Sequence, residues 1–244
     1  MSQQTRMVNG SAFEFLRSII PTISVGVNAA DVMQLDSELA LLEQTDVELA
    51  HFDVMDGCFT PMMTVGAPFI KSVRTLLLKD VHLMIEEPLE KVDAYVAAGA
   101  DIITVHAESS IHLHRVFQKL GGMQNVNDPA RGLIRGIALN PGTPLNVIDP
   151  LLDEVELVML LGINPGWGGQ LFIPSTFSRV AELRKMIAAR EKDVLICVDG
   201  GITKTNISDM AGVDIDVVVT GSAVYDGKDP VENARFMIER LQAK

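Results

Sequence analysis

Residues 47–54 read Val-Glu-Leu-Ala-His-Phe-Asp-Val, a short apolar and β-branched run that carries a histidine and an aspartate two positions apart. Such a run predicts a buried β-strand. Because successive side chains of a strand point to opposite faces, His51 and Asp53 share one face. The fold class then depends on which other strands and helices the rest of the sequence predicts.

Seven further runs of the same kind occur at residues 22–27, 80–85, 102–106, 133–139, 156–163, 194–198 and 217–220. Several are apolar almost throughout, which is typical of parallel strands covered on both faces. Segments with helical spacing lie between them, for example 176–190 and 31–44, the latter with Val32, Leu35, Leu39 and Leu42 near one face. Strand and helix alternating eight times within 244 residues favours a closed (β/α)8 TIM barrel over a doubly wound open sheet.

The whole chain, 1–244, is predicted to form one barrel domain, with residues 1–18 as an N-terminal extension. Within this extension, residues 13–19 predict a short helix that closes the bottom of the barrel. A polar insert at 121–131 connects the predicted fourth helix to the fifth strand. Such connections lie opposite the catalytic face, so we expect the insert to have no catalytic role.

The net charge of −12 argues against a nucleic-acid partner, because nucleic acids are bound by neutralising phosphates with Lys and Arg. Two cysteines, Cys58 and Cys197, form no disulfide framework or zinc knuckle, although one bridge between them is left open. The N-terminus lacks the pattern of a signal peptide, and the apolar runs are too short to cross a bilayer. We therefore expect a cytoplasmic protein without a membrane partner.

Polar side chains gather at the carboxyl ends of the predicted strands, where barrel enzymes place their functional residues. His82 lies toward the carboxyl end of the third strand, beside His51 and Asp53, and Asp199 directly follows the seventh run. Two imidazoles and two carboxylates form a ligand set for one divalent ion; Zn²⁺ is expected, and Fe²⁺, Mn²⁺ and Co²⁺ are the alternatives. His106 and Glu108 are interpreted as polar groups at the exit of the fourth strand. His112 and His114 are expected in the fourth helix, without a role.

Glycine clusters follow the last three strands. They are Asn164-Pro-Gly-Trp-Gly-Gly-Gln170 after the sixth, Asp199-Gly-Gly201 at the end of the seventh, and Gly221-Ser222 after the eighth. Consecutive N–H groups next to glycines can hold an anion, and the loops after the last strands are the usual phosphate site of barrels. The clusters predict that the ligand carries a phosphate.

Five segments resemble the signature segments of the ribulose-phosphate 3-epimerase family, in that family's order. They are His51-Phe-Asp-Val-Met-Asp-Gly-Cys-Phe-Thr-Pro61, Asp80-Val-His-Leu-Met84, Leu139-Asn-Pro-Gly-Thr-Pro144, Asn164–Gln170 and Asp199–Gly201, and the resemblance extends over residues 20–240. It implies a (β/α)8 fold, a divalent metal, and interconversion of D-ribulose 5-phosphate and D-xylulose 5-phosphate. It also implies a homo-oligomer with a small-molecule ketose phosphate as its partner.

The resemblance also assigns roles. The metal ligands are His51, Asp53, His82 and Asp199, and the acid–base pair is Asp53 and Asp199. His82 and the glycine loops bind the substrate and its phosphate, through Gly166, Trp167, Gly168, Gly169, Gly200, Gly201, Gly221 and Ser222. Gly26, Met55 and Met84 line the pocket.

Several positions depart from the family pattern. Val25-Gly26 replaces a Pro-Ser pair, Met62 replaces an Asn, Leu161 replaces a pocket methionine, and Trp167 replaces a Phe. These positions surround the sugar, so a 3-epimerase of another ketose phosphate, such as allulose 6-phosphate, is an alternative.

The expected reaction is inversion at C3 by two aspartates, through an enediolate that the metal stabilises. An orotidine-phosphate-type decarboxylase or aldolase is a rival, but its Asp-x-Lys-x-x-Asp motif is replaced by Asp53-Val-Met-Asp56. A non-catalytic sugar-phosphate-binding barrel is the alternative from another class.

Overall fold

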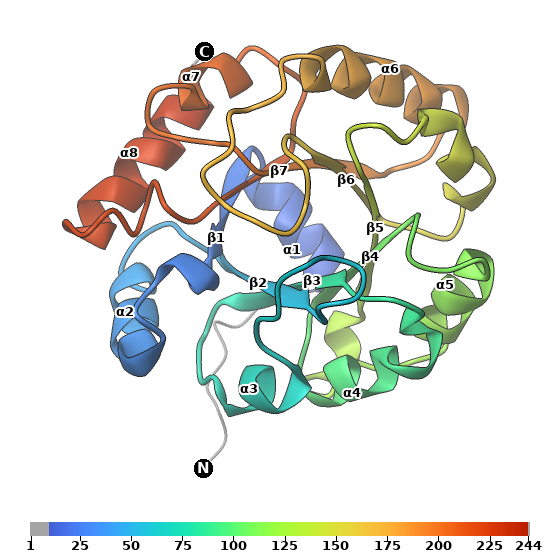
Figure 1. Cartoon of the computed structure of the whole chain (residues 1–244), viewed down its shortest axis with the longest axis horizontal. Helices are drawn as coiled ribbons and strands as arrows, with labels where there is room; N and C mark the ends of the chain where they lie inside the picture. Colours follow the sequence, from blue (N-terminus) through green and yellow to red (C-terminus); the bar gives the residue numbers. More distant parts are fainter. Residues whose placement is uncertain (1–9, 244) are drawn as a thin grey trace.

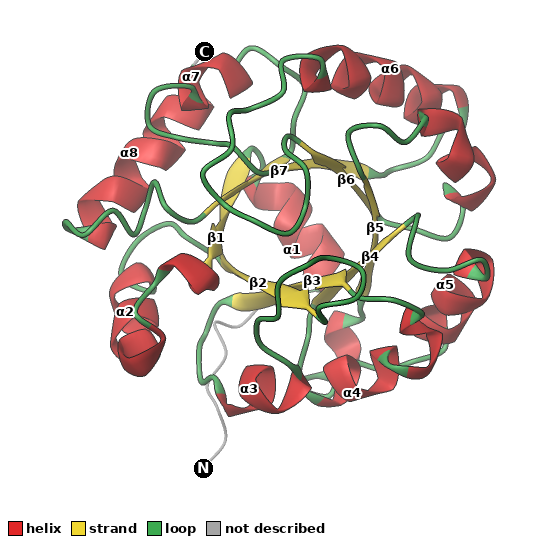
Figure 2. Ribbon diagram, viewed as in Figure 1, coloured by secondary structure: helices red, strands yellow, loops and turns green. Residues whose placement is uncertain are grey.

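A computed structural model describes residues 10–243, which form a closed barrel of eight parallel strands in the order β1 to β8 (Figures 1 and 2). The strands are β1 (Thr22–Gly26), β2 (Leu49–Met55), β3 (Leu78–Met84), β4 (Ile102–His106), β5 (Ile134–Leu139), β6 (Leu157–Leu161), β7 (Leu195–Asp199) and β8 (Val217–Thr220). The predicted (β/α)8 fold is confirmed.

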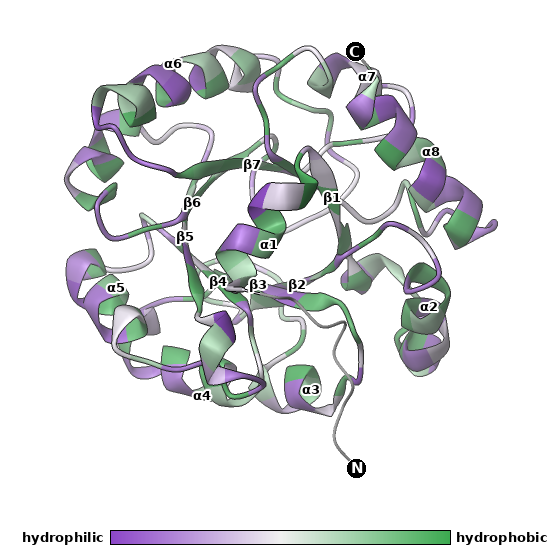
Figure 3. Ribbon diagram, turned by 180° about the vertical axis from the view of Figure 1, so that it is seen from behind, coloured by the Kyte–Doolittle hydropathy of each residue, from purple (hydrophilic) through white to green (hydrophobic). Residues whose placement is uncertain are grey.

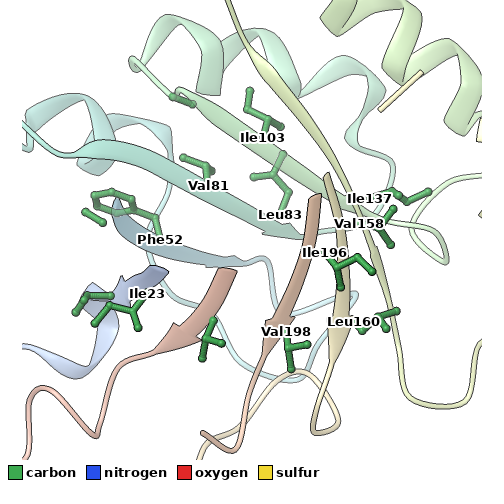
Figure 4. Packing of buried hydrophobic residues seen from close by; sticks show 14 of the residues in the cluster. Ile23, Phe52, Val81, Leu83, Ile103, Ile137, Val158, Leu160, Ile196 and Val198 are labelled. Carbon is green, nitrogen blue, oxygen red and sulfur yellow. The ribbon is translucent and has the colours of Figure 1, made fainter. Parts of the chain in front are cut away.

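Helices surround the barrel. They are α2 (Leu35–Leu42), α3 (Ala67–Ser72), α4 (Val92–Ala97), α5 (Leu113–Gly121), α6 (Thr176–Ala189), α7 (Ile207–Met210) and α8 (Pro230–Gln242). Their apolar faces cover the outward side chains of the strands, including Phe52, Val81 and Ile196 (Figure 4). The connection from β5 to β6 contains a 3₁₀ helix, η5 (Leu145–Leu151), in place of an α-helix. Pro150 lies inside η5, and its missing N–H cannot continue an α-helical hydrogen-bond pattern.

The inward side chains of the strands form a second cluster, which is apolar at the amino ends of the strands. Helix α1 (Ala12–Ile19) lies across this end (Figure 3) and buries Ala12 and Leu16 against residues such as Leu49, Leu78 and Ile102. Ser11 and Glu14 form a capping box that starts the helix. The predicted helix at 13–19 is thus present one residue longer, and residues 1–9 of the predicted extension lie outside the described residues.

Two predicted helix boundaries are wrong. In the segment 31–44, a 3₁₀ helix, η2 (Val32–Gln34), precedes α2, because the Asp31 side chain accepts the Met33 N–H and starts a tight turn. Val32 is exposed as a result, whereas Leu35, Leu39 and Leu42 are buried as predicted. Similarly, α5 starts at Leu113, so His114 is helical and His112 is the residue before the helix.

The insert at 121–131 packs onto the amino end of β4. Asn125 donates to Asp101 at 2.8 Å, and the Arg131 guanidinium lies 3.2 Å from the same carboxylate, with both side chains buried. Asp101 directly precedes β4, so the insert lies at the end of the barrel away from the strand-end polar residues. In the described part of the chain, no helix is long and apolar enough to cross a membrane.

Candidate active site

Strand register brings the predicted strand-end residues together. Asp53 of β2 is the register partner of His82 on β3. The His82 Nδ1 atom lies 3.3 Å from Asp53 Oδ1 and 3.3 Å from Asp199 Oδ2 of β7, and His51 Nε2 lies 3.2 Å from Asp53 Oδ1. One ligand atom from each of these four residues falls within 4.8 Å of the others. Hereafter they are called the four-residue cluster.

The cluster favours positive charge at its centre. Burial alone would lower the pKa values of His51 and His82, but neighbouring carboxylates outweigh it and raise both. Burial raises the pKa of Asp53, yet the two imidazoles outweigh it, so the net shift of that pKa is downward. A cation at this position is therefore stabilised by both carboxylates.

The donor set also fits a divalent ion. The imidazoles are fully buried, and the Nδ1 atom of His82 has no hydrogen-bond partner although it faces two carboxylates. A buried nitrogen without a partner is rare in folded proteins. Two imidazole nitrogens and two carboxylate oxygens at this spacing match the borderline ligands of Zn²⁺ and related ions.

A cavity of about 570 Å³ opens above the cluster. Asp53 and Asp199 reach its floor, whereas His51 and His82 lie beneath and do not line it. The predicted phosphate residues line its wall together: Gly166, Trp167, Gly168, Gly169, Gly200, Gly201, Gly221 and Ser222. Gly26, Met55, Met62, Met84 and Leu161 line the same cavity.

The glycine loops need their glycines for backbone shape and close approach. Gly200 has φ of +96°, and a Cβ there would lie 2.4 Å from Ile163 Cγ1. A Cβ on Gly166 would meet Pro61 and Thr60 at 3.0 Å, so the loop after β6 touches the loop after β2. Figure 1 shows both loops in front of the barrel mouth. No Arg or Lys of residues 10–243 lines the cavity, which leaves N–H and hydroxyl groups as the donors for an anion.

Comparison with known proteins identifies the family. A sequence profile of the ribulose-phosphate 3 epimerase family matches residues 22–225. A ribulose-phosphate 3-epimerase of Bacillus subtilis (strain 168) is 40% identical over 210 residues, which cover 85% of this chain and 93% of the relative. The chain belongs to the ribulose-phosphate 3-epimerase family.

A second relative supports the family, and a solved structure supports the fold. A chloroplastic ribulose-5-phosphate-3-epimerase of Arabidopsis thaliana is 39% identical over 214 residues, covering 86% of this chain and 73% of the relative. The crystal structure of 3-keto-L-gulonate-6-phosphate decarboxylase from Vibrio cholerae matches 91% of this chain and 98% of that chain, with a TM-score of 0.61. At 14% identity, this likeness concerns the fold alone. The expected class of enzyme, an isomerase acting on carbohydrates, is confirmed by the family.

Sequence reasoning missed one residue behind the metal-ligand candidates of this epimerase-family chain. The Asp80 Oδ2 atom lies 2.7 Å from His51 Nδ1 and accepts the Ser24 hydroxyl at 2.8 Å. Asp80 is the register partner of His51 and shares the inward face with His82, two positions along β3. The alternation of side chains along β3 was therefore the signal that could have identified it.

The interpretation of His106 and Glu108 as polar groups at a strand exit was incomplete. The His106 ring stacks on the His82 ring, with centroids 4.9 Å apart, and the two Nε2 atoms lie 2.8 Å apart. The other nitrogen of His106, Nδ1, lies 3.2 Å from Glu108 Oε2. Burial lowers the pKa of His106 to about 4, so this imidazole is neutral near pH 7.

Proposed function

We propose that this protein inverts the configuration at C3 of a phosphorylated ketose, with D-ribulose 5-phosphate and D-xylulose 5-phosphate as the substrate pair. One observation carries the proposal. Two carboxylates from different sides of the barrel, Asp53 and Asp199, both approach within 3.3 Å of one buried imidazole nitrogen beneath a glycine-walled cavity. Family membership supports the same reaction.

His51, Asp53, His82 and Asp199 would hold one divalent ion, for which Zn²⁺ is the first candidate. When bound, the ion supplies a Lewis acid that stabilises negative charge on the oxygens next to C3. Neither buried imidazole lines the cavity, so this proposal does not include the predicted contact of His82 with the substrate. Their role is to fix the ion beneath it.

Proton transfer belongs to Asp53 and Asp199. Their strands, β2 and β7, are separated by β8 and β1 around the barrel, so the carboxylates approach the cavity from different directions. One carboxylate removes the C3 proton from one face of the sugar and leaves an enediolate. The other delivers a proton to the opposite face, which inverts the centre, and the roles exchange in the reverse reaction.

The glycine loops hold the phosphate end. Backbone N–H groups around Gly200, Gly201 and Gly221, together with Ser222, can donate to phosphate oxygens without a cationic side chain. Anchoring the phosphate fixes the sugar so that C3 lies between the two carboxylates.

A second candidate substrate is a longer ketose phosphate such as allulose 6-phosphate. Gly26 lines the cavity and brings no side chain into its wall. The resemblance leads us to expect a serine at this position, so the smaller residue is the observation that favours this candidate.

The test is metal-dependent exchange of the C3 proton in deuterated water, with pentulose and hexulose phosphates compared. The proposal expects exchange with ribulose 5-phosphate far above the others, and loss of exchange in D53N and D199N. Faster exchange with a hexulose phosphate would select the second candidate. Binding of sugar phosphate without any exchange would indicate a non-catalytic barrel. A cytoplasmic location and a homo-oligomeric state stay predictions.

A further inference from the structure

The end of β4 carries a pair of polar side chains that the proposed reaction does not use. His106 is fully buried, and its ring packs against the His82 ring and against the Phe59 ring, with centroids 4.9 Å and 4.8 Å apart. Neither His106 nor Glu108 lines the substrate cavity. Their contacts run instead to His82, to Phe59 and to the loop after β5.

The hydrogen between the two imidazoles can have only one position at a time. His82 Nε2 and His106 Nε2 lie 2.8 Å apart, so one nitrogen donates and the other accepts. His82 Nδ1 is the atom that faces Asp53 and Asp199, and a metal ligand must present a free lone pair. A neutral His82 that binds through Nδ1 has its proton on Nε2, and His106 Nε2 is then the acceptor.

The remaining contact of His106 agrees with this arrangement. A neutral His106 that accepts at Nε2 carries its own proton on Nδ1, which faces Glu108 Oε2 at 3.2 Å. The other oxygen of Glu108, Oε1, accepts the Asn140 N–H at 2.9 Å and the Thr143 hydroxyl. An ionised carboxylate is an acceptor only, so Glu108 sets the direction of the whole chain of hydrogen bonds.

We infer that His106 and Glu108 are positioning residues that keep the proton of His82 on Nε2 and leave its Nδ1 lone pair for a divalent ion. The inference rests on the proposed function, because it assigns His82 as a ligand. It also distinguishes the two imidazoles of the cluster. His51 is held directly by the Asp80 carboxylate, whereas His82 is held through a second imidazole.

Glu108→Gln is the decisive variant. Two donors, the Asn140 N–H and the Thr143 hydroxyl, hold the carbonyl oxygen of the new amide on their side. The NH₂ group then faces His106 Nδ1 and must donate to it. His106 is forced to carry its proton on Nε2, where it opposes the Nε2 proton of His82. Metal binding through His82 Nδ1 then requires a broken hydrogen bond between two buried rings.

The affinity for Zn²⁺ and for Co²⁺ would be measured by competition with a chelating dye. Loss of an outer partner of a metal-bound histidine typically weakens metal binding 10- to 100-fold, and we expect this for Glu108→Gln. Glu154→Gln is the matched control, since Glu154 lies 3.7 Å from the exposed His114 at the surface. Its dissociation constants should stay within about twofold of wild type.

His106→Phe is the second variant, because it keeps a stacking ring and removes the acceptor. It should weaken metal binding to a similar extent, and far-ultraviolet circular dichroism would show that both variants are folded. Nitrogen-15 chemical shifts of Zn²⁺-loaded wild type should place the protons on His82 Nε2 and His106 Nδ1. Protonation of His106 at Nε2 in that spectrum, or wild-type affinity in both variants, would overturn the inference. Wild type that binds neither ion would instead reject the proposed function itself.

Discussion

Single residues behind the four-residue cluster decide how well it holds an ion. Asp80 is the clearest case, because its carboxylate accepts from His51 and from Ser24, both of which are buried. A carboxylate behind a ligating imidazole fixes the ring orientation and raises its basicity. Asp80 therefore belongs to the site although it does not face the cavity.

Asp80→Asn should raise the Zn²⁺ dissociation constant about 10- to 100-fold, because an amide is a weaker acceptor and no longer carries charge. Dye competition would measure this change. Ser24→Ala removes a single hydroxyl donor and keeps the carboxylate, so its dissociation constant should change less than that of Asp80→Asn. Equal affinities in wild type and Asp80→Asn would show that His51 needs no carboxylate behind it.

The glycines of the loops proposed to bind the phosphate differ in whether they leave room for a side chain. Gly200→Ala places a side chain at φ of +96° and 2.4 Å from Ile163, which costs about 1–3 kcal/mol or displaces the loop. We expect the KM for ribulose 5-phosphate to rise about tenfold. A Cβ on Gly168 would have no atom within 4 Å, and the residue keeps its N–H on substitution. The KM of Gly168→Ala for ribulose 5-phosphate should therefore stay within about twofold of the wild-type value. Steady-state kinetics on both variants would test the difference.

At the scale of single residues, the sequence pattern predicted only which side chains share one face of a strand or lie at its end. His51 and Asp53 follow from alternation within a single strand, and His82 and Asp199 follow from their places at strand ends. The contact of His106 with His82 depends on the register of β3 against β4, in which Thr104 and not His106 is the partner of His82. Sequence spacing contains no such register, so the role of His106 became visible only in the folded barrel.

Among the elements, the loop after β2 is fixed in part by one carboxylate. Asp56 accepts N–H groups from Cys58 and Phe59 in its own loop, and from Glu86 after β3, each at 2.9 Å. Burial raises the pKa of Asp56, but these N–H groups and Lys91 outweigh it, so the net shift is downward from 3.8. The ionised form is therefore the one that stabilises the fold.

Asp56→Asn should lower the free energy of unfolding at pH 7 by about 1–2 kcal/mol, through loss of charge-assisted hydrogen bonds. Because the folded pKa lies below 3.8, the contribution of Asp56 is fully present above that pH and is lost as pH falls through the folded value. The gap between variant and wild type should thus shrink below about pH 3.8, as urea unfolding at several pH values would measure. An equal gap at pH 3 and pH 7 would contradict this assignment; the exposed Asp46→Asn serves as control.

Helix α1 is the element that closes the amino end of the barrel. Leu16 is fully buried against the inward residues of the strands, and Leu16→Ala should lower the free energy of unfolding by about 2–5 kcal/mol. Leu171→Ala is the matched control, because Leu171 is 90% exposed and should change stability by less than about 0.5 kcal/mol. Thermal or urea unfolding of both variants would test whether α1 is part of the cooperative fold.

The sequence predicted the elements better than their ends. All eight strands and the helix at 13–19 were expected, since apolar runs and helical spacing report burial directly. The 3₁₀ turns at Val32–Gln34 and Leu145–Leu151 were missed. Each turn depends on one residue that disfavours an α-helix, Asp31 through its side-chain hydrogen bond and Pro150 through its missing N–H. The spacing of apolar residues contains no information about either effect.

The charge of the whole molecule sets how a phosphorylated sugar meets the site. The chain has a net charge of −12, and no Arg or Lys of residues 10–243 lines the cavity. The protein therefore repels the phosphorylated sugar at long range. It binds the phosphate only through the short-range N–H and hydroxyl donors of the cavity. This arrangement is the opposite of electrostatic steering, in which the field of the protein accelerates association.

Raising the ionic strength should consequently increase kcat/KM. The Debye length falls from about 30 Å at 0.01 M salt to about 10 Å at 0.1 M, which screens the long-range repulsion and leaves the hydrogen bonds of the cavity intact. We expect a rise on the order of twofold over this range in NaCl, with kcat nearly unchanged because chemistry occurs after binding. Initial-rate kinetics in the metal-loaded enzyme would measure both constants. A steep fall in kcat/KM with salt would contradict this account, because it would mean that cationic side chains outside the cavity wall attract the phosphate.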